Sequence, residues 1–282
     1  QQHQELLITD TKYIFACDPL LPKFDSSLPD INEAFNGTSM EEPNFISFDE
    51  GVYEIGYEGE DFHYDNEEGR HKKYLHDFKM MNRPVTNGEF IEFINDGGYE
   101  NPVLWMDDGW GWINENQIKT PLYWQMKDGE HYQFTLNGMQ KVNPNAPVTH
   151  LSFYEADAFA RWKGMRMPTE EEWEVATAEL EHETSGNSNF MDTGNLAPVP
   201  GAGKHFLGNV WEWTESAYRP YPFYKAEEGA LGEYNGKFMI NQMVLRGGSC
   251  ATPRDHIRRT YRNFFHPEMR WQFNGIRLAY YT

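Results

Sequence analysis

Apolar side chains at the start of the chain follow the period of a helix. Leu6, Leu7, Ile14 and Phe15, together with Thr11, lie at spacings of three, four and seven residues. Side chains at these spacings share one face of a helix. We therefore expect residues 1–16 to form a helix with one apolar face, the last helix of a preceding domain.

Residues 17–43 lack this periodicity and predict an extended linker. Prolines interrupt helices and central strands, and this segment holds Pro19, Pro22, Pro29 and Pro43. A domain boundary is expected here, with a second domain covering residues 44–282.

Strand patterns and then a helix open this second domain. Residues 45–57 alternate loosely between apolar and polar, and a second strand candidate spans residues 74–80. Thr86, followed three residues later by Glu89, forms a capping box, in which each side chain accepts a hydrogen bond from the other residue's backbone. A helix is expected from here to the glycine pair at 97–98.

Two further helices are predicted near the middle of the chain. One begins at Ser152, where Glu155 completes a second capping box, and ends before Gly164. The other begins at Thr169, with acidic residues in its first turn. The last third of the chain has no long periodic run, so the pattern favours one α+β domain with many loops.

Composition narrows the class of protein. Aromatic residues make up 16% of the 282 residues, and 24 glycines and 16 prolines punctuate them, which favours short elements around an irregular core of large rings. With 44 acidic and 24 basic residues the formal charge is −20, so the broad basic surface of a nucleic-acid-binding protein is absent.

The location of the protein is predicted from three features. There is neither an apolar run of 18 residues nor a signal-peptide pattern, so no membrane is expected. The two cysteines, Cys17 and Cys250, cannot form a disulfide framework, and this fits a reducing compartment such as the cytoplasm.

The chain begins with Gln1, which suggests that it was cut or trimmed.

Five sequence segments occur in the order of one family. They are PVTNGEF (84–90), PVTHLSFYEADAFARWKGMRMPTEEEWEVA (147–176), GNVWEWT (208–214), VLRGGSCAT (244–252) and NGIRLA (274–279). Together they resemble the formylglycine-generating-enzyme, or sulfatase-modifying-factor, superfamily over residues 44–282. The resemblance implies that superfamily's C-type-lectin-like α+β fold. From the residues alone, the glycine pair at 247–248 is expected to permit a tight turn after a strand.

The chemistry of formylglycine generation is disfavoured. The founding enzyme holds copper with two cysteines a few residues beyond the GGS turn, and these places are held here by Thr252 and Ile257. Cys250 has no thiol nearby in sequence, and a lone cysteine is usually a small buried hydrophobic residue.

The first residues point to another branch of the superfamily. QQHQELLITDTKYIF resembles the end of the HEQQHQEL motif of ergothioneine sulfoxide synthases, whose DinB-like helical domain supplies three histidines to a non-haem Fe(2+). The resemblance makes His3 the last iron ligand and Gln2 a substrate contact, and places the other ligands before Gln1. Residues 1–16 are then the terminal helix of a truncated DinB-like domain, and the chain by itself is expected to be inactive.

The substrate side of the resemblance lies in TYRNFFHPEMRWQFNGIRLA (260–279). Synthases of this type place an Asn and an aromatic residue near hercynine, a histidine betaine with a trimethylammonium group, and Asn263 and Phe264 match them. An aromatic ring attracts such a cation through its quadrupole. Members that use γ-glutamylcysteine carry an acidic and a basic residue where Phe265 and Met269 stand here, so both cysteine and γ-glutamylcysteine remain candidate thiols.

Activation of O2 also needs a proton donor, for which a tyrosine phenol is suitable. Tyr221, Tyr224 and Tyr234 are candidates by location alone.

The resemblance further suggests a calcium site. Gly208, Val210 and Glu212 match positions that bind a structural Ca(2+) in the founding enzyme, and oxygen ligands suit that ion. The side-chain ligand expected three residues earlier is His205, a poor calcium ligand.

Three hypotheses follow. The leading one is an oxidoreductase in which iron, hercynine, a thiol and O2 give a sulfoxide. The second is a non-catalytic ligand-binding module of the same fold, and the third is a formylglycine-generating oxidase, disfavoured by the missing cysteine pair.

Overall fold

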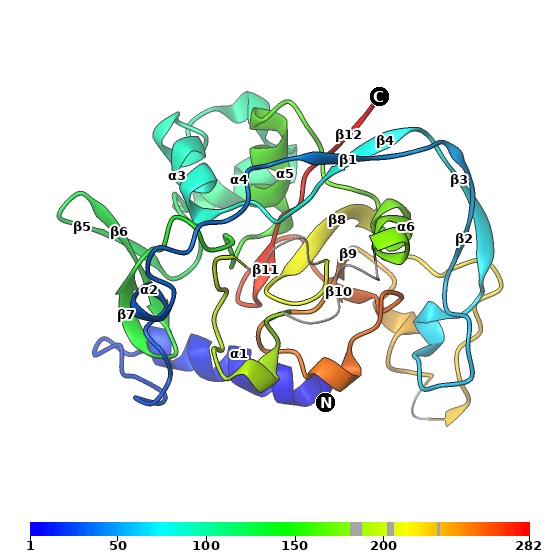
Figure 1. The fold of residues 1–282 in the computed structure, drawn as a ribbon, viewed down its shortest axis with the longest axis horizontal. Coiled ribbons are helices and arrows are strands. Elements are labelled where there is room, and N and C mark those ends of the chain that lie inside the picture. Colours follow the sequence, from blue (N-terminus) through cyan, green and yellow to red (C-terminus); the bar gives the residue numbers. More distant parts are fainter. Residues whose placement is uncertain (181–187, 202–205, 230–231) are drawn as a thin grey trace.

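Short helices and four small sheets make up the described part of the chain (Figure 1). The computed structural model describes residues 1–180, 188–201, 206–229 and 232–282. The helices are α1 (Gln2–Cys17), α2 (Ile31–Ala34), α3 (Asn87–Asn95), α4 (Asp107–Glu115), α5 (Phe153–Trp162) and α6 (Glu170–Leu180). The 3-10 turns are η1 (Asp65–Glu67), η2 (Pro102–Leu104), η4 (Met191–Thr193), η6 (Gly236–Phe238) and η7 (Arg254–His256).

The strands pair mostly antiparallel. β1 (Phe45–Phe48), β4 (Phe78–Met81) and β12 (Ala279–Tyr281) form one sheet in the order β1-β4-β12, and β2 (Gly51–Ile55) pairs with β3 (His71–Leu75). β5 (Trp124–Lys127), β6 (Glu130–Thr135) and β7 (Gly138–Lys141) form a meander. The sheet that bears on the site has the order β10-β9-β8-β11, from Asn263–Phe265, Met243–Arg246, Trp211–Ala217 and Asn274–Gly275. Only β11 in it runs parallel to its neighbour among these described strands.

The predicted helix starts are confirmed. The Thr86 hydroxyl accepts a hydrogen bond from the Glu89 amide at 3.3 Å, and the Glu89 carboxylate accepts one from the Thr86 amide at 2.8 Å. The Ser152 and Glu155 box is formed in the same way at the start of α5. At α6, Thr169 pairs with Glu172. These motifs are local, so a few residues suffice to specify them.

The strand expected over residues 45–57 is two strands in two sheets. β1 pairs with β4, whereas β2 pairs with β3, and Asp49 and Glu50 separate them. The candidate at 74–80 likewise divides between β3 and β4. The turn after β9 agrees with expectation, because Gly247 has φ +101° and a Cβ there would lie 2.6 Å from the Phe206 carbonyl oxygen.

Helix α1 forms as predicted, but its apolar face is not the face that packs on the domain. Leu7 and Ile14 are 67% and 64% exposed. Glu5, Thr9 and Lys12 are the buried side chains instead. The spacing therefore predicted the helix and misplaced its contacts, because the surface beneath α1 offers polar partners.

Residues 17–43 run along the domain surface. The buried Ile31 in α2 packs against Ala197 and Val199, and the Asn32 side-chain amide donates to the Lys141 carbonyl at 2.8 Å. The domain boundary expected near residue 44 stays a prediction.

The main core lies between α3, α5 and β8. Phe90 and Phe159 stack at 5.3 Å between ring centroids, and the buried Trp213 meets Phe153 edge to face at 5.9 Å. Figure 1 shows α3 and α5 on the side of the molecule opposite α1. None of the helices described is long and apolar enough to span a bilayer.

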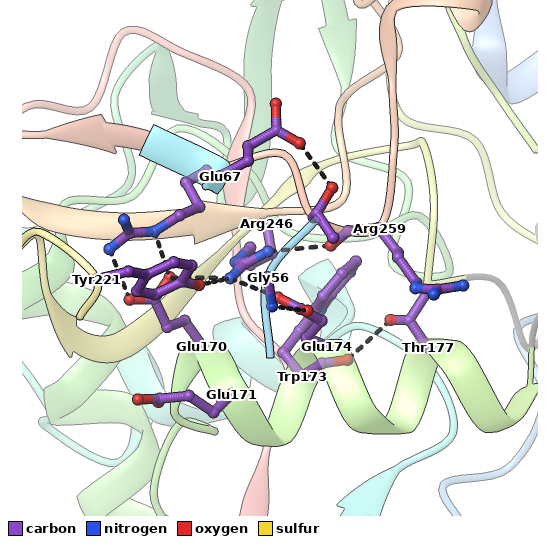
Figure 2. Close-up of polar contacts among 12 residues, drawn as sticks. Gly56, Glu67, Glu170, Glu171, Trp173, Glu174, Thr177, Tyr221, Arg246 and Arg259 are labelled. Carbon is purple, nitrogen blue, oxygen red and sulfur yellow. Dashed lines mark hydrogen bonds and ion pairs between the residues drawn. The ribbon is translucent and has the colours of Figure 1, made fainter. Parts of the chain in front are cut away.

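A buried charge cluster joins α6 to β9 and to the segment before β10 (Figure 2). Glu170 accepts hydrogen bonds from Arg246 at 2.9 Å and from Arg262 at 2.8 and 2.9 Å. Burial alone would raise the pKa of Glu170, but Arg262 and Arg246 outweigh it and hold that pKa below its ordinary value. Arg262 directly precedes Asn263, so the cluster fixes the start of β10.

Candidate functional site

A pocket of about 230 Å³ opens between α1, β10 and the segment around η6. Its walls are largely aromatic, with a few amide groups and two side chains that can carry charge. They are Gln2, Glu5, Leu6, Trp211, Tyr234, Lys237, Phe238, Tyr261, Asn263, Phe264, Phe265 and Gln272.

Five of the residues predicted from sequence meet in this pocket. Gln2 comes from α1, Tyr234 from the segment before η6, and Asn263, Phe264 and Phe265 from β10. These segments are far apart along the chain. Antiparallel pairing of β10 with β9 sets Asn263 opposite Leu245, which presents the three β10 residues at the pocket.

Phe264 stands in a stack of three rings. Its ring lies 4.1 Å from that of Tyr218 with an interplanar angle of 10°, and 5.8 Å from that of Phe238. Packing against these two rings holds the Phe264 ring in one orientation. The pocket therefore offers a fixed aromatic wall, with Trp211 and the buried Tyr261, 5.4 Å apart, as another.

Polar groups gather where α1 meets the pocket. The Tyr64 hydroxyl donates to the side-chain oxygen of Gln2 at 3.4 Å and lies 3.4 Å from Nε2 of His256. Burial, followed by the nearby Arg258, lowers the pKa of His256 to about 4. This imidazole is therefore neutral at pH 7.

Glu5 anchors α1 to the domain. Its buried carboxylate accepts hydrogen bonds from Trp211 Nε1 at 2.8 Å, Ser249 Oγ at 2.6 Å and Thr252 Oγ1 at 2.8 Å. Burial raises its pKa and these donors oppose the rise. Because Gln2 and His3 lie less than one turn before Glu5, this network sets where both side chains stand.

His3 lies next to Tyr234. The Tyr234 hydroxyl is 3.3 Å from His3 Nε2, and the rings meet edge to face at 6.3 Å. No group of three or more His, Cys, Asp or Glu side chains suited to a metal occurs within the described ranges. His3 alone does not make an iron site, so the residues present do not fit the metal by themselves.

The structure does not bring the other tyrosine candidates to the pocket. Tyr221 is buried in the charge cluster, where its hydroxyl donates to Glu170 at 3.2 Å and accepts from Arg246 at 2.8 Å (Figure 2). Tyr224 donates to Asp65 at 3.1 Å. Both phenols make hydrogen bonds away from the pocket, so the geometry favours neither as a group that meets a substrate there.

Met269 also lies outside the pocket lining. Its carbonyl accepts a hydrogen bond from the Asn274 side chain at 3.5 Å. The chain turns after β10, so Phe265 faces the pocket whereas Met269 does not.

The calcium expectation does not fit the geometry. Glu212 is fully buried, and its carboxylate accepts hydrogen bonds from Arg277 at 2.6 and 2.8 Å and from Trp173 at 2.7 Å. The Gly208 carbonyl accepts the Val210 amide at 2.9 Å. His205 lies outside the described residues. A carboxylate already neutralised by a buried guanidinium is a poor ligand for a second cation, so this geometry disfavours a calcium site at Gly208, Val210 and Glu212.

Cys250 is buried and packs with Ala251 and Phe273, which confirms that it is a small core residue. Burial raises the pKa of its thiol. Thr252 stands where the founding enzyme has one of its copper-binding cysteines, and its hydroxyl donates a hydrogen bond to Glu5. This corner of the fold holds α1 in place.

Sequence reasoning missed several pocket residues. Glu5, Trp211 and Tyr261 lie inside segments already singled out for their resemblance, so a signal was present. Lys237 and Phe238 lie in a region without periodicity or a recognised motif, and only the tertiary structure places them here.

Comparison with known proteins places this chain in a family. The model of the sulfatase-modifying factor enzyme 1-like domain matches residues 32–200 and 201–281. A hercynine oxygenase of Mycolicibacterium smegmatis is 35% identical over 241 residues, covering 77% of this chain and 56% of that protein. Ergothioneine biosynthesis protein 1 of Schizosaccharomyces pombe is 28% identical over 246 residues, covering 83% of this chain and 29% of that protein.

A solved structure shares the fold at low identity. Treponema denticola variable protein 1 superposes with a TM-score of 0.55 at 16% identity, covering 84% of this chain and 95% of that one. This chain spans about half the length of the mycobacterial-type relatives it matches. On the extent of the domain match, the chain belongs to the family of proteins with a sulfatase-modifying factor enzyme 1-like domain.

Proposed function

We propose that this chain supplies the substrate pocket of an oxidoreductase of ergothioneine biosynthesis, which joins hercynine to a thiol through an oxidised sulfur. The observation that carries the proposal is the aromatic pocket that gathers Gln2, Tyr234, Asn263, Phe264 and Phe265. The names of the relatives, a hercynine oxygenase and an ergothioneine biosynthesis protein, support the substrate and the pathway.

The aromatic wall suits the trimethylammonium group of hercynine. A quaternary ammonium cannot donate N–H hydrogen bonds, and an aromatic face is worth about 0.5–2 kcal/mol to it. Phe264, fixed by Tyr218 and Phe238, offers such a face without a cost of ordering the ring on binding. Gln2 and Asn263 add amide groups that can hydrogen-bond the rest of the substrate.

Tyr234 is the tyrosine that the geometry favours as proton donor. Its hydroxyl lies 3.3 Å from His3 Nε2, and Tyr234 lines the pocket. A phenol donates a proton without carrying charge at rest. Tyr221 and Tyr224 are occupied elsewhere.

Iron remains part of the proposal for the whole protein. His3 would be one ligand, and the other ligands would come from residues outside this sequence. Cysteine and γ-glutamylcysteine remain the two candidate thiols, with O2 as oxidant.

The test uses the protein encoded by the complete reading frame. Hercynine, O2 and either thiol are supplied, and the sulfoxide is measured by mass spectrometry. We expect product with at least one thiol, and a fall of about 10²- to 10⁴-fold in turnover for Tyr234→Phe. Tyr224→Phe is the matched control and should retain activity.

Two results would count against this proposal. Binding of hercynine without turnover in the wild-type protein would favour the non-catalytic binding module. Equal activity of Tyr234→Phe and wild type would remove Tyr234 as the proton donor and leave the pocket assignment standing.

A further inference from the structure

Lys237 is the cation of the pocket. Of the described residues that line it, Glu5 and Lys237 are the two with ionisable acidic or basic side chains. Glu5 is buried beneath the pocket, and its oxygens already accept three hydrogen bonds. Lys237 is exposed at the wall, so its ammonium can reach an anionic group that enters.

The described part of the chain gives Lys237 no carboxylate within ion-pair distance. Its ammonium lies 5.3 Å from the ring centroid of Phe238. An unpaired ammonium at the wall of an aromatic pocket is available to a ligand.

The backbone that carries Lys237 is firmly held on both sides. The buried Asn235 donates from its side-chain amide to Asp65 at 2.5 Å. On the other side, Phe238 packs against Phe264, and its amide donates to the Asn235 carbonyl at 3.0 Å. Lys237 therefore stays beside the ring stack, whereas its flexible stem lets the ammonium adjust to a ligand.

We propose that Lys237 binds the α-carboxylate of a zwitterionic amino-acid substrate in this pocket. In hercynine the carboxylate and the trimethylammonium share one carbon. A ligand whose cation rests on Phe264 therefore brings its carboxylate toward Lys237, whose neighbour Phe238 packs against Phe264. The inference rests on the proposed function for the identity of the substrates. The pairing itself rests on the positions of Lys237 and the rings.

This assignment also addresses the missing basic residue in the loop after β10. Met269 lies outside the pocket and cannot offer a charge, whereas Lys237 offers one from a different segment. The thiol substrate carries an α-carboxylate too. The shared chemistry is an α-carboxylate, and the two sources are separated by experiment.

The experiment compares Lys237→Gln and Lys237→Arg with wild type in the protein encoded by the complete reading frame. Dissociation constants are measured for hercynine and for its decarboxylated analogue, which keeps the imidazole and the trimethylammonium. KM values are measured for hercynine and for cysteine. Lys225→Gln, an exposed lysine outside the pocket lining, is the matched control for the change in net charge.

We expect Lys237→Gln to weaken one carboxylate-bearing substrate about 10- to 100-fold, as loss of a charge-assisted hydrogen bond does. Lys237→Arg should restore most of that loss. If the hercynine carboxylate is bound, hercynine weakens while the analogue is unaffected. If the thiol carboxylate is bound, only the KM for cysteine rises.

Unchanged binding and unchanged KM values for both substrates in Lys237→Gln would overturn the inference. Absence of sulfoxide from the wild-type protein would overturn the proposed reaction instead, and the hercynine binding measurements would still decide the role of Lys237. A wild-type protein that binds neither substrate would overturn both.

Discussion

Glu5→Ala tests whether polar contacts, and not the apolar stripe of α1, hold this helix on the domain. The Glu5 carboxylate accepts three hydrogen bonds, one from β8 through Trp211 and two from the turn after β9 through Ser249 and Thr252. The substitution removes all three. Alanine is the better helix former by a few tenths of a kcal/mol, so any loss of stability comes from tertiary contacts.

The size of the loss follows from what becomes of each donor. The hydroxyls of Ser249 and Thr252 are 3.4 Å apart and can turn toward each other. The indole N–H of Trp211 is left buried without an acceptor, which costs about 1–3 kcal/mol. With the small cavity added, we expect about 2–4 kcal/mol of the free energy of unfolding to be lost.

Glu5→Gln keeps the shape of the side chain but cannot ionise, so it isolates the effect of the carboxylate charge. Burial raises the pKa of Glu5 above its ordinary value of 4.5, so the folded state holds the proton more tightly than the unfolded state. The stabilisation from this difference is complete below pH 4.5 and is lost as pH rises through the folded-state pKa. Wild type should therefore lose stability relative to Glu5→Gln as pH rises above 4.5.

Urea unfolding followed by tryptophan fluorescence measures both effects, and hydrogen exchange of the α1 amides shows whether the helix detaches first. Gln4→Ala, at the exposed neighbouring position, is the control. A loss below about 0.5 kcal/mol for Glu5→Ala, with unchanged α1 protection, would refute the reasoning. It would mean that the hydrogen bonds of Glu5 do not hold α1 on the domain.

Three other predictions follow from the same structure. Arg277→Met should lower the free energy of unfolding by about 3–5 kcal/mol, because it leaves the buried Glu212 carboxylate without its ion-pair partner. Ca(2+) or a chelator should not shift the melting temperature of wild type. A rise in that temperature with Ca(2+) would support the calcium site. Burial lowers the pKa of Lys12, whose ammonium lies 2.7 Å from His150 Nε2, to about 7. Between pH 7 and 10 the unfolded state therefore binds more protons than the folded state, and wild type should gain stability over Lys12→Met by at most about 1.4 kcal/mol per pH unit. Urea midpoints of the two proteins that change in parallel across that range would contradict this. Phe264→Leu should weaken hercynine about 2- to 30-fold in a binding titration, whereas Phe223→Leu, an exposed control, should not.

Local patterns identified a large part of the fold. The three capped helices began where their side chains specified, since a capping box is complete within four residues. The family fold came from five short motifs in order, and the domain match confirms it. The strands around β1 to β4 were divided wrongly, because pairing partners are chosen by long-range contacts that a local alternation does not encode.

The candidate site was partly visible in the same way. Asn263, Phe264 and Gln2 were found through resemblance, and the structure gathers them at one pocket. The choice among Tyr221, Tyr224 and Tyr234 could not be made from location in the chain. It depended on which hydroxyl was already bound by a charged neighbour.

The sequence by itself determined the helix starts, because nearby residues encode them, and its resemblance to a known family indicated the α+β fold and the aromatic residues of β10. Tertiary structure alone decided which face of α1 is buried, which tyrosine meets His3, and that Lys237 joins the pocket. The physical reason is that burying a polar side chain costs free energy unless it finds hydrogen-bond partners. Glu5 and Lys12 can be buried only because Trp211, Ser249, Thr252 and His150 receive them, and no spacing along the chain records those partners.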